Sequence, residues 1–420
     1  MPQDLPPSPF APKKPAKLPP IEGVELTVRA SGTRYQGRND VLMMQFPKGT
    51  KVAGVFTRSK MPSAAVDLSR QHLQAAAGGG KARALVVNAG NANAFTGKAG
   101  AKAALAMAKG VAKLTDCAVE NVFVASTGVI GEDLDAAPLI AALSDKQTEG
   151  DSWQAAAQAI MTTDTFAKLA SQTVRFGAQE VTLNAIAKGS GMIAPDMATM
   201  LCFIVTDAAL PVGLLQKLLR AENEQSFNCV TVDSDTSTSD TCLLFATGGK
   251  KLSGAPLRSV DDKRLAGFRK GLRALMQDLA MQLAGDGEGI SKRMTIDVKG
   301  AATDAAAKNI ALAIGNSPLV KTAVAGEDAN WGRIVMAVGK SGEAAERDRL
   351  SIDIGGVQVA RKGRAVANYK EAPVAKHMRG REVHIAVNVG ALGGRGKGQA
   401  RIWASDLTHG YISINADYRS

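Results

Sequence analysis

The stretch Lys188-Gly-Ser-Gly-Met-Ile-Ala-Pro-Asp-Met-Ala-Thr199-Met-Leu-Cys-Phe-Ile-Val205 decides how this 420-residue chain is organised. Residues 189–196 contain two glycines and one proline, which do not continue a regular helix and therefore predict a loop. Residues 200–205 form a continuous apolar run, which predicts a buried strand. Thr199 is thus expected at the junction of loop and strand, and it is our candidate nucleophile.

A threonine hydroxyl attacks an acyl group only with a base beside it. One solution is to make the threonine a chain terminus, so that its own α-amine accepts the proton. Such an amine titrates near neutral pH. It exists only if the Ala198–Thr199 bond is cut, so the chain would have to process itself. The alternative for an isolated threonine is a β-branched residue that opens a strand and has no chemical role.

Further segments along most of the chain resemble one known family, in the family's order. Together with Lys188 to Leu201, they are similar to the ornithine acetyltransferase family, the bifunctional glutamate N-acetyltransferases of arginine biosynthesis. Only the N-terminal segment up to Pro20 falls outside the match. The similar segments are Gly54-Val-Phe-Thr-Arg-Ser, Asn88-Ala-Gly-Asn-Ala-Asn-Ala-Phe-Thr-Gly97, Ser126-Thr-Gly-Val-Ile-Gly131, Met161-Thr-Thr-Asp-Thr165, Thr231-Val-Asp-Ser-Asp-Thr-Ser-Thr238, Gly326-Glu-Asp-Ala-Asn-Trp-Gly-Arg-Ile334 and Asn415-Ala-Asp-Tyr-Arg-Ser420.

The resemblance implies an enzyme that cleaves itself between Ala198 and Thr199 and then moves an acetyl group from N2-acetylornithine to glutamate through an acetyl ester on Thr199. It implies no cofactor, with acetyl-CoA as a further donor that the sequence leaves open, and an assembly of two α and two β chains. Thr127 and Gly128 would form the oxyanion hole. The implied substrate contacts are Thr162, Lys188, Thr199, Glu288, Asn415 and Ser420.

The residues themselves are compatible with these roles. A predicted strand at 120–125 leads into Ser126-Thr127-Gly128, where glycine frees the backbone to expose N–H groups to an oxyanion; an ordinary turn is the alternative. Lys188 could hold a substrate α-carboxylate, and Glu288 could hold the side-chain ammonium of ornithine. Solvated surface charge is the alternative for each. The four histidines lie in no nucleophile-elbow motif, so a histidine base is not expected.

The composition predicts a globular α/β or α+β protein of layered sheets and helices. Hydrophobic residues make up 45% of the chain, which suffices for sizeable cores, and aromatic residues only 4%. The net charge of +12 is spread along the chain without interleaved aromatic residues, so nucleic acid is not an expected partner. The four cysteines show no metal-binding spacing. No apolar run reaches the ~20 residues that span a bilayer, and we expect a cytoplasmic protein.

The order of predicted elements divides the chain into three parts. Residues 1–24 are rich in Pro and Lys and are expected to be a loosely attached tail. Residues 25–198 form a half with the oxyanion loop, and residues 199–420 form a half that begins at the nucleophile. The predicted strands are 25–30, 41–46, 52–57, 83–88, 120–125, 172–176, 180–187, 200–206, 293–299, 351–360, 382–388, 400–404 and 411–415, and the predicted helices are 67–77, 98–113, 134–144, 152–161, 211–223, 260–284 and 304–314.

The chain end is expected to reach the active site, because the apolar pattern at 411–414 predicts a strand that carries Asn415 to Ser420 inward. Two other functions remain open at this point. One is a related N-terminal-nucleophile aminopeptidase or amidohydrolase, which keeps the self-cleaving threonine but transfers the acyl group to water. The other is a basic binding protein without catalytic activity, which would not process itself.

Overall fold

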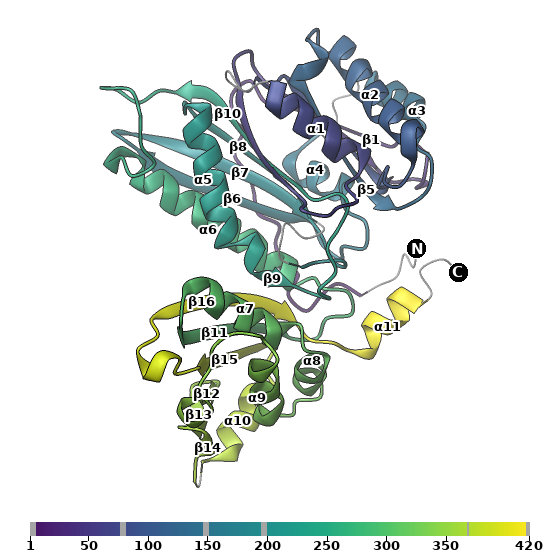
Figure 1. Cartoon of the computed structure of the whole chain (residues 1–420). Helices are drawn as coiled ribbons and strands as arrows, with labels where there is room; N and C mark the ends of the chain where they lie inside the picture. The colour runs from purple at the N-terminus through teal and green to yellow at the C-terminus, as the bar shows by residue number, and fades with distance from the viewer. Residues whose placement is uncertain (1–5, 76–80, 146–150, 195–199, 368, 417–420) are drawn as a thin grey trace.

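Two β-sheets packed face to face form the upper body of the molecule (Figure 1). The computed structural model describes residues 6–75, 81–145, 151–194, 200–367 and 369–416. The first sheet has the order β1 (Glu25–Arg29), β2 (Val41–Gln45), β4 (Ala84–Asn91), β5 (Val122–Val129). The second sheet has the order β3 (Lys51–Phe56), β10 (Thr241–Lys250), β8 (Leu201–Ala208), β7 (Gln179–Lys188), β6 (Lys168–Phe176).

Both faces of the first sheet are buried, because alternate side chains along a strand belong to two different cores. Leu42 and Met44 of β2 belong to the core between the two sheets, whereas Met43 belongs to the core under the outer helices. Phe46 and Phe245 stack across the inter-sheet core with ring centroids 4.3 Å apart. Because both faces are covered, the central strands read as continuous apolar runs rather than as alternating ones.

Helices cover the outer faces of both sheets, so the upper body has four layers (Figure 1). On the first sheet these are α1 (Ala64–Ala75), α2 (Gly97–Leu114) and α3 (Ala136–Leu143); on the second sheet they are α5 (Val212–Glu224) and α6 (Ala266–Ala284). A further helix, α4 (Trp153–Ala159), contacts strands of both sheets. The prediction of layered sheets and helices in a mixed α/β fold is confirmed.

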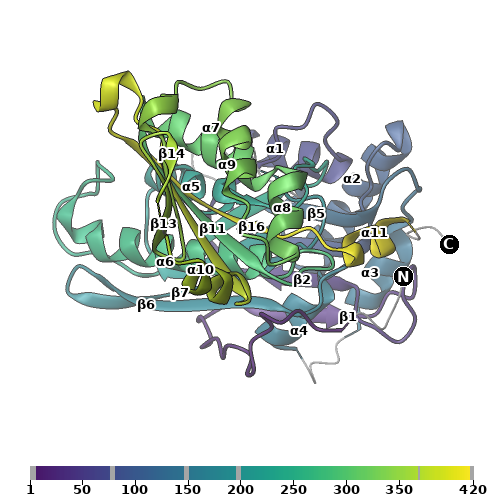
Figure 2. The same cartoon turned by 90° about the horizontal axis from the view of Figure 1, so that it is seen from below.

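A third sheet lies on the other side of α6, as Figure 1 and the view from below in Figure 2 show. Its order is β14 (Arg364–Ala365), β13 (Val357–Arg361), β12 (Ser351–Ile354), β15 (Glu382–Asn388), β11 (Arg293–Ala301), β16 (Gly398–Ser405), β9 (Val230–Thr231). The accompanying helices are α7 (Asp304–Gly315), α8 (Pro318–Ala325), α9 (Trp331–Gly339) and α10 (Glu371–Met378). One continuous core joins α5 and α6 to the third sheet. No helix in the described ranges is long and apolar enough to cross a bilayer.

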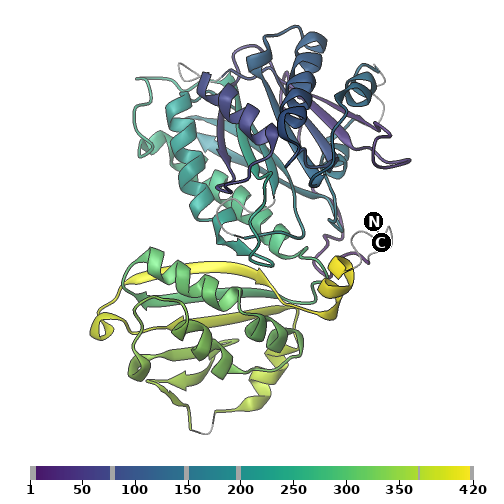
Figure 3. The ribbon, with the colours of Figure 1, turned by 45° about the vertical axis from the view of Figure 1, so that its right-hand side comes forward.

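Two predicted strands differ from the structure. The expected single strand at 351–360 is a hairpin, because Gly355 and Gly356 take φ values of 59° and 78° and turn the chain between β12 and β13. The expected strand at 411–415 is the helix α11 (His409–Ala416), which lies beside the junction of the upper body and the third sheet (Figure 3). The apolar pattern at 411–414 covers only four residues, which is too short to distinguish the period of a helix from the period of a strand.

The described part of the N-terminal segment is attached to the body, which corrects the expectation of a loose tail. Ser8 is 7% exposed. Its N–H donates to Thr165 Oγ1 at 2.8 Å, and its hydroxyl donates to the carbonyl of Gly285 at 2.5 Å. Further along, Asn184 donates to the carbonyl of Pro19 at 2.6 Å. These contacts tie the segment to the second sheet and to the end of α6.

Candidate active site

A cavity of about 540 Å³ lies where the two upper sheets meet the loop before β11 and helix α11. Six of the predicted site residues line it: Thr127, Gly128, Thr162, Lys188, Glu288 and Asn415. They come from five separate segments of the chain, so only the tertiary fold brings them together. Ala198, Thr199 and Ser420 lie outside the described residues.

Lys188 and Thr127 meet on one wall of this cavity. Lys188 ends β7 and Thr127 lies near the end of β5, and both side chains are buried. The Lys188 ammonium donates to the Thr127 hydroxyl at 3.1 Å. Burial lowers the pKa of Lys188, against the opposing influence of the nearby carboxylates of Asp164, Asp240 and Glu288. A buried ammonium whose hydrogen-bond partner is a neutral hydroxyl is suited to bind an anionic group.

Gly128 allows an unusually close approach of two strands. It pairs with Gly90 of β4 and has a φ of 134°, a conformation that favours glycine. A Cβ atom at this position would lie 2.2 Å from the carbonyl carbon of Gly90. A residue other than glycine at position 128 would therefore be strained in this backbone conformation. The backbone of Thr127 and Gly128 reaches the cavity because position 128 is a glycine.

Glu288 and Asn415 line the same cavity and contact each other. The Asn415 amide donates to Glu288 Oε2 at 2.7 Å, and also to the carbonyl of Tyr411 one helical turn earlier at 3.0 Å. Glu288 packs against Gly191, where a Cβ atom would lie 2.5 Å from its carboxylate. The second glycine of the Lys188-Gly-Ser-Gly motif thus makes room for the carboxylate. The chain end reaches the cavity through a helix rather than through the predicted strand.

Two cavity residues, Asp233 and Tyr411, were missed in the sequence. Asp233 accepts the backbone N–H groups of Met192 at 2.6 Å and of Ile193 at 2.8 Å, and Tyr411 donates its hydroxyl to Asp233 at 3.4 Å. Burial raises the pKa of both side chains. Asp233 lies in the similar segment Thr231 to Thr238, to which the sequence assigns no chemical role. Tyr411 lies in the predicted strand at 411–415.

Asp240 was also missed, although it lies next to the start of β8. Its Oδ1 accepts the N–H of Met200, the residue that follows Thr199, at 3.0 Å, and Thr241 donates its N–H to the carbonyl of Met200 at 3.1 Å. The side chain is fully buried. Burial raises the pKa of Asp240 well above its usual range.

The cavity carries charges of both signs. Lys188 supplies a cation beside Thr127, whereas Asp233 and Glu288 supply carboxylates that contact Tyr411 and Asn415 of helix α11. This distribution complements a ligand that carries a carboxylate at one end and an ammonium at the other. In the described ranges, no cluster of three or more His, Cys, Asp or Glu side chains could hold a metal ion.

Comparisons of the sequence with a family model and with known proteins agree on one family. The ArgJ family model matches residues 25–420. The arginine biosynthesis bifunctional protein ArgJ of Rhizobium meliloti is 54% identical over 417 residues, which cover 98% of this chain and 99% of the relative. The protein of the same name from Agrobacterium fabrum is 53% identical over 416 residues, with the same coverage.

Solved structures of two similar proteins align over about half of the chain. The crystal structure of arginine biosynthesis bifunctional protein ArgJ from Bacillus halodurans is 37% identical, covers 51% of this chain and 98% of its own, and has a TM-score of 0.47. Ornithine acetyltransferase from Mycobacterium tuberculosis, in complex with ornithine, is 27% identical, covers 43% of this chain and 93% of its own, and has a TM-score of 0.33.

Proposed function

The chain belongs to the ArgJ family, and on this premise we propose that it transfers an acetyl group from N2-acetylornithine to the amine of glutamate in arginine biosynthesis. The observation that carries the proposal is that one cavity is lined by both the Lys188 ammonium and the Glu288 carboxylate. Lys188 supports binding of the substrate α-carboxylate, and Glu288, held by Asn415, supports binding of the ornithine side-chain ammonium. Thr162 and Ser420 complete the proposed substrate contacts.

The proposed reaction proceeds in two half-reactions through Thr199. Its hydroxyl attacks the acetyl carbonyl while its α-amine accepts the hydroxyl proton, which gives a tetrahedral oxyanion. Thr127 and Gly128 stabilise that oxyanion, and its collapse returns the proton to the departing amine of ornithine. In the second half-reaction, the glutamate amine attacks the acetyl ester, and the threonine hydroxyl is restored. Closing the cavity to water would protect the ester between the two steps.

The α-amine requires that the chain cleave itself between Ala198 and Thr199. The described flank supports this part of the proposal, because Asp240 and Thr241 hold both backbone groups of Met200 and so fix the chain directly after Thr199. We propose that residues 1–198, which comprise the N-terminal segment 1–24 and the segment 25–198, become one piece and residues 199–420 the other, and that two of each assemble. The assay described next also tests acetyl-CoA as a second donor. The cytoplasm is the proposed location of the protein.

The test is a steady-state assay of acetyl transfer by purified protein, with N2-acetylornithine or acetyl-CoA as donor and glutamate as acceptor. The proposal predicts acetylglutamate from N2-acetylornithine, and none from Thr199→Ala. Release of free acetate at the same rate with and without glutamate would instead indicate a hydrolase. Activity of Thr199→Ala equal to that of the unaltered protein would contradict the proposal.

A further inference from the structure

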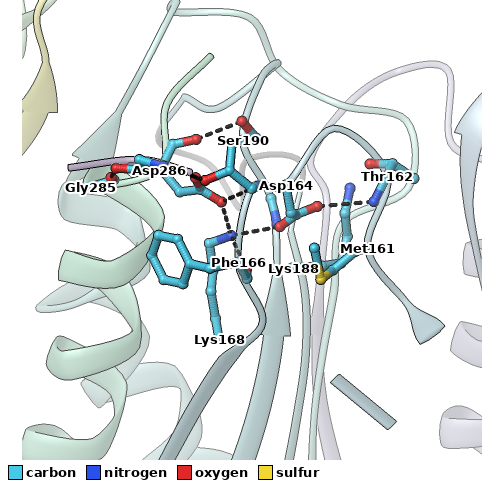
Figure 4. A network of polar contacts seen from close by, with 12 residues as sticks. Met161, Thr162, Asp164, Phe166, Lys168, Lys188, Ser190, Gly285 and Asp286 are labelled. Atoms are coloured by element: carbon cyan, nitrogen blue, oxygen red, sulfur yellow. Dashed lines mark hydrogen bonds and ion pairs between the residues drawn. The ribbon is translucent and has the colours of Figure 1, made fainter. Parts of the chain in front are cut away.

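Lys168 lies between two carboxylates behind the cavity (Figure 4). Its ammonium is 2.7 Å from Asp164 Oδ1 and 2.6 Å from Asp286 Oδ2. All three side chains have zero exposed fraction. Asp164 precedes β6, Lys168 begins it, and Asp286 follows α6, so the ammonium joins two parts of the chain that are far apart in sequence.

Asp164 fixes two backbone segments that carry cavity residues. Its Oδ2 accepts the N–H of Thr162 at 3.0 Å (Figure 4), and its Oδ1 accepts the N–H of Gly189 at 2.6 Å. Thr162 lines the cavity itself, and Gly189 follows Lys188 directly. A single carboxylate therefore sets the spacing between Thr162 and the end of β7.

Asp286 fixes the third segment. Its carboxylate accepts the N–H of Thr165 at 3.0 Å and also the Thr165 hydroxyl. Its backbone carbonyl accepts the hydroxyl of Ser190 at 2.5 Å. Because Asp286 lies two residues before Glu288, these bonds connect the glutamate's loop to both segments that Asp164 holds.

We propose that Asp164, Lys168 and Asp286 are positioning residues of the active site, which hold Thr162, Lys188 and Glu288 at the spacing a substrate requires and place a fixed negative charge behind the Lys188 ammonium. This inference rests on the proposed function, since it takes Lys188 as the partner of a substrate carboxylate. None of the three residues lines the cavity, so they act through the residues that do.

The charge of Asp164 bears directly on Lys188. Burial lowers the pKa of Lys188, and the positive charge of Lys168 lowers it further. Asp164, Asp240 and Glu288 act in the opposite direction. Among these carboxylates, Asp164 is itself held ionised: although burial opposes its charge, Lys168 and Lys188 lower its pKa well below the usual range. Removing this charge would make the Lys188 ammonium easier to deprotonate.

Buried ion pairs contribute little net stability, because desolvation offsets most of their attraction. What such a network supplies here is geometry, because five donor groups make six hydrogen bonds to two carboxylates that have no exposed surface. A network of this kind fixes loop positions more tightly than apolar packing of the same volume would, since hydrogen bonds are directional.

The deciding experiment compares Asp164→Asn with Glu222→Gln in the full-length protein. Glu222 is a matched control, because it is also a fully buried carboxylate in an ion pair, with Arg273 at 2.6 Å, but lies on α5 away from the cavity. Hydrogen–deuterium exchange without substrate, thermal midpoint, kcat, and KM for N2-acetylornithine across pH are measured for each. Lys168→Met, which removes the cation of the same network, is a second variant for the same measurements if it folds.

We expect faster exchange of the Thr162 and Gly189 amides in Asp164→Asn, and kcat/KM lower by about 100-fold, as for a substrate group misplaced by about 1 Å. The alkaline rise in KM should move to lower pH. Glu222→Gln should lower the thermal midpoint alone. The inference is overturned if Asp164→Asn loses thermal stability like the control but keeps its exchange pattern, KM and pH profile. If the unaltered protein transfers no acetyl group, the proposed function fails, and the exchange data alone decide whether the network positions these segments.

Discussion

Two buried lysines on neighbouring strands differ in what surrounds their ammonium groups. Lys168 begins β6 and pairs in register with Ala187, directly before Lys188 at the end of β7. Lys168 contacts two carboxylates, which outweigh its burial and raise its pKa. Lys188 contacts a threonine hydroxyl, and burial lowers its pKa. The first ammonium is enclosed by two carboxylates of the protein, whereas the second lies at the cavity, where we propose that it binds a substrate carboxylate.

Replacing each lysine by methionine should separate the two roles most strongly. Lys168→Met leaves two buried carboxylates without their cation, which should lower the free energy of unfolding by about 3–5 kcal/mol. Lys188→Met removes a buried charge that forms no ion pair with a carboxylate in the described part of the chain, so stability should be equal or higher. Denaturant unfolding of both variants measures this. Equal losses would remove the distinction between the two sites.

Thr127→Ala tests the partner of Lys188. If Thr127 donates to the oxyanion, its loss should lower kcat by about 10²–10³, as for other oxyanion-hole donors, with a modest change in KM. Steady-state kinetics with N2-acetylornithine and glutamate provide the measurement, and Ser126→Ala on the same strand is the control. An unchanged kcat would remove Thr127 from the oxyanion hole.

Asn415→Ala tests the contact between helix α11 and Glu288. It breaks the hydrogen bond that holds Glu288, at an expected loss of about 1–3 kcal/mol in substrate binding. Ile412→Ala is the matched control on the same helix, because Ile412 is 60% exposed. Substrate affinity should fall in Asn415→Ala only, with little change in thermal midpoint. The same KM in both variants would show that helix α11 is ordinary surface.

The pH dependence of stability gives the smallest effect. Because the folded-state pKa of Lys188 lies below the usual 10.5, the unfolded chain binds more protons between these two values, and the free energy of unfolding contributed by this group rises with pH across that window. The advantage of Lys188→Met should therefore shrink as the pH rises toward the usual lysine pKa. Lys168 has a raised pKa, so its contribution is complete below 10.5 and is lost only above it. A constant difference between Lys188→Met and the unaltered protein would contradict the lowered pKa.

Sequence patterns predicted elements with a clear period and the segments that meet at the cavity. Strands such as β2 and β4, and the helix α2, follow directly from their apolar runs. Asn415 was expected at the site for a wrong local reason, since a helix rather than a strand carries it. The central strand β10 was not recognised, although its apolar run lies in the inter-sheet core.

What the sequence could not reveal are pairings between distant segments. Asp164 lies in the similar segment Met161 to Thr165, and Asp286 lies two residues before the predicted contact Glu288, yet their ion pairs with Lys168 depend on how β6 and the end of α6 meet. Asp240 is likewise distant from Met200 along the chain, and its role as hydrogen-bond acceptor follows from the parallel pairing of β8 with β10. Spacing in a sequence carries no information on contacts of this kind.

The central claim is that acetyl transfer passes through the hydroxyl of a terminal Thr199. The most direct measurement is mass spectrometry of the purified protein, before and after incubation with N2-acetylornithine in the absence of glutamate. We expect a fragment of 420 − 198 = 222 residues that begins at Thr199. Incubation with N2-acetylornithine should add the mass of one acetyl group to Thr199, and addition of glutamate should remove that mass. A single uncut chain, or an acetyl group on any other residue, would contradict it.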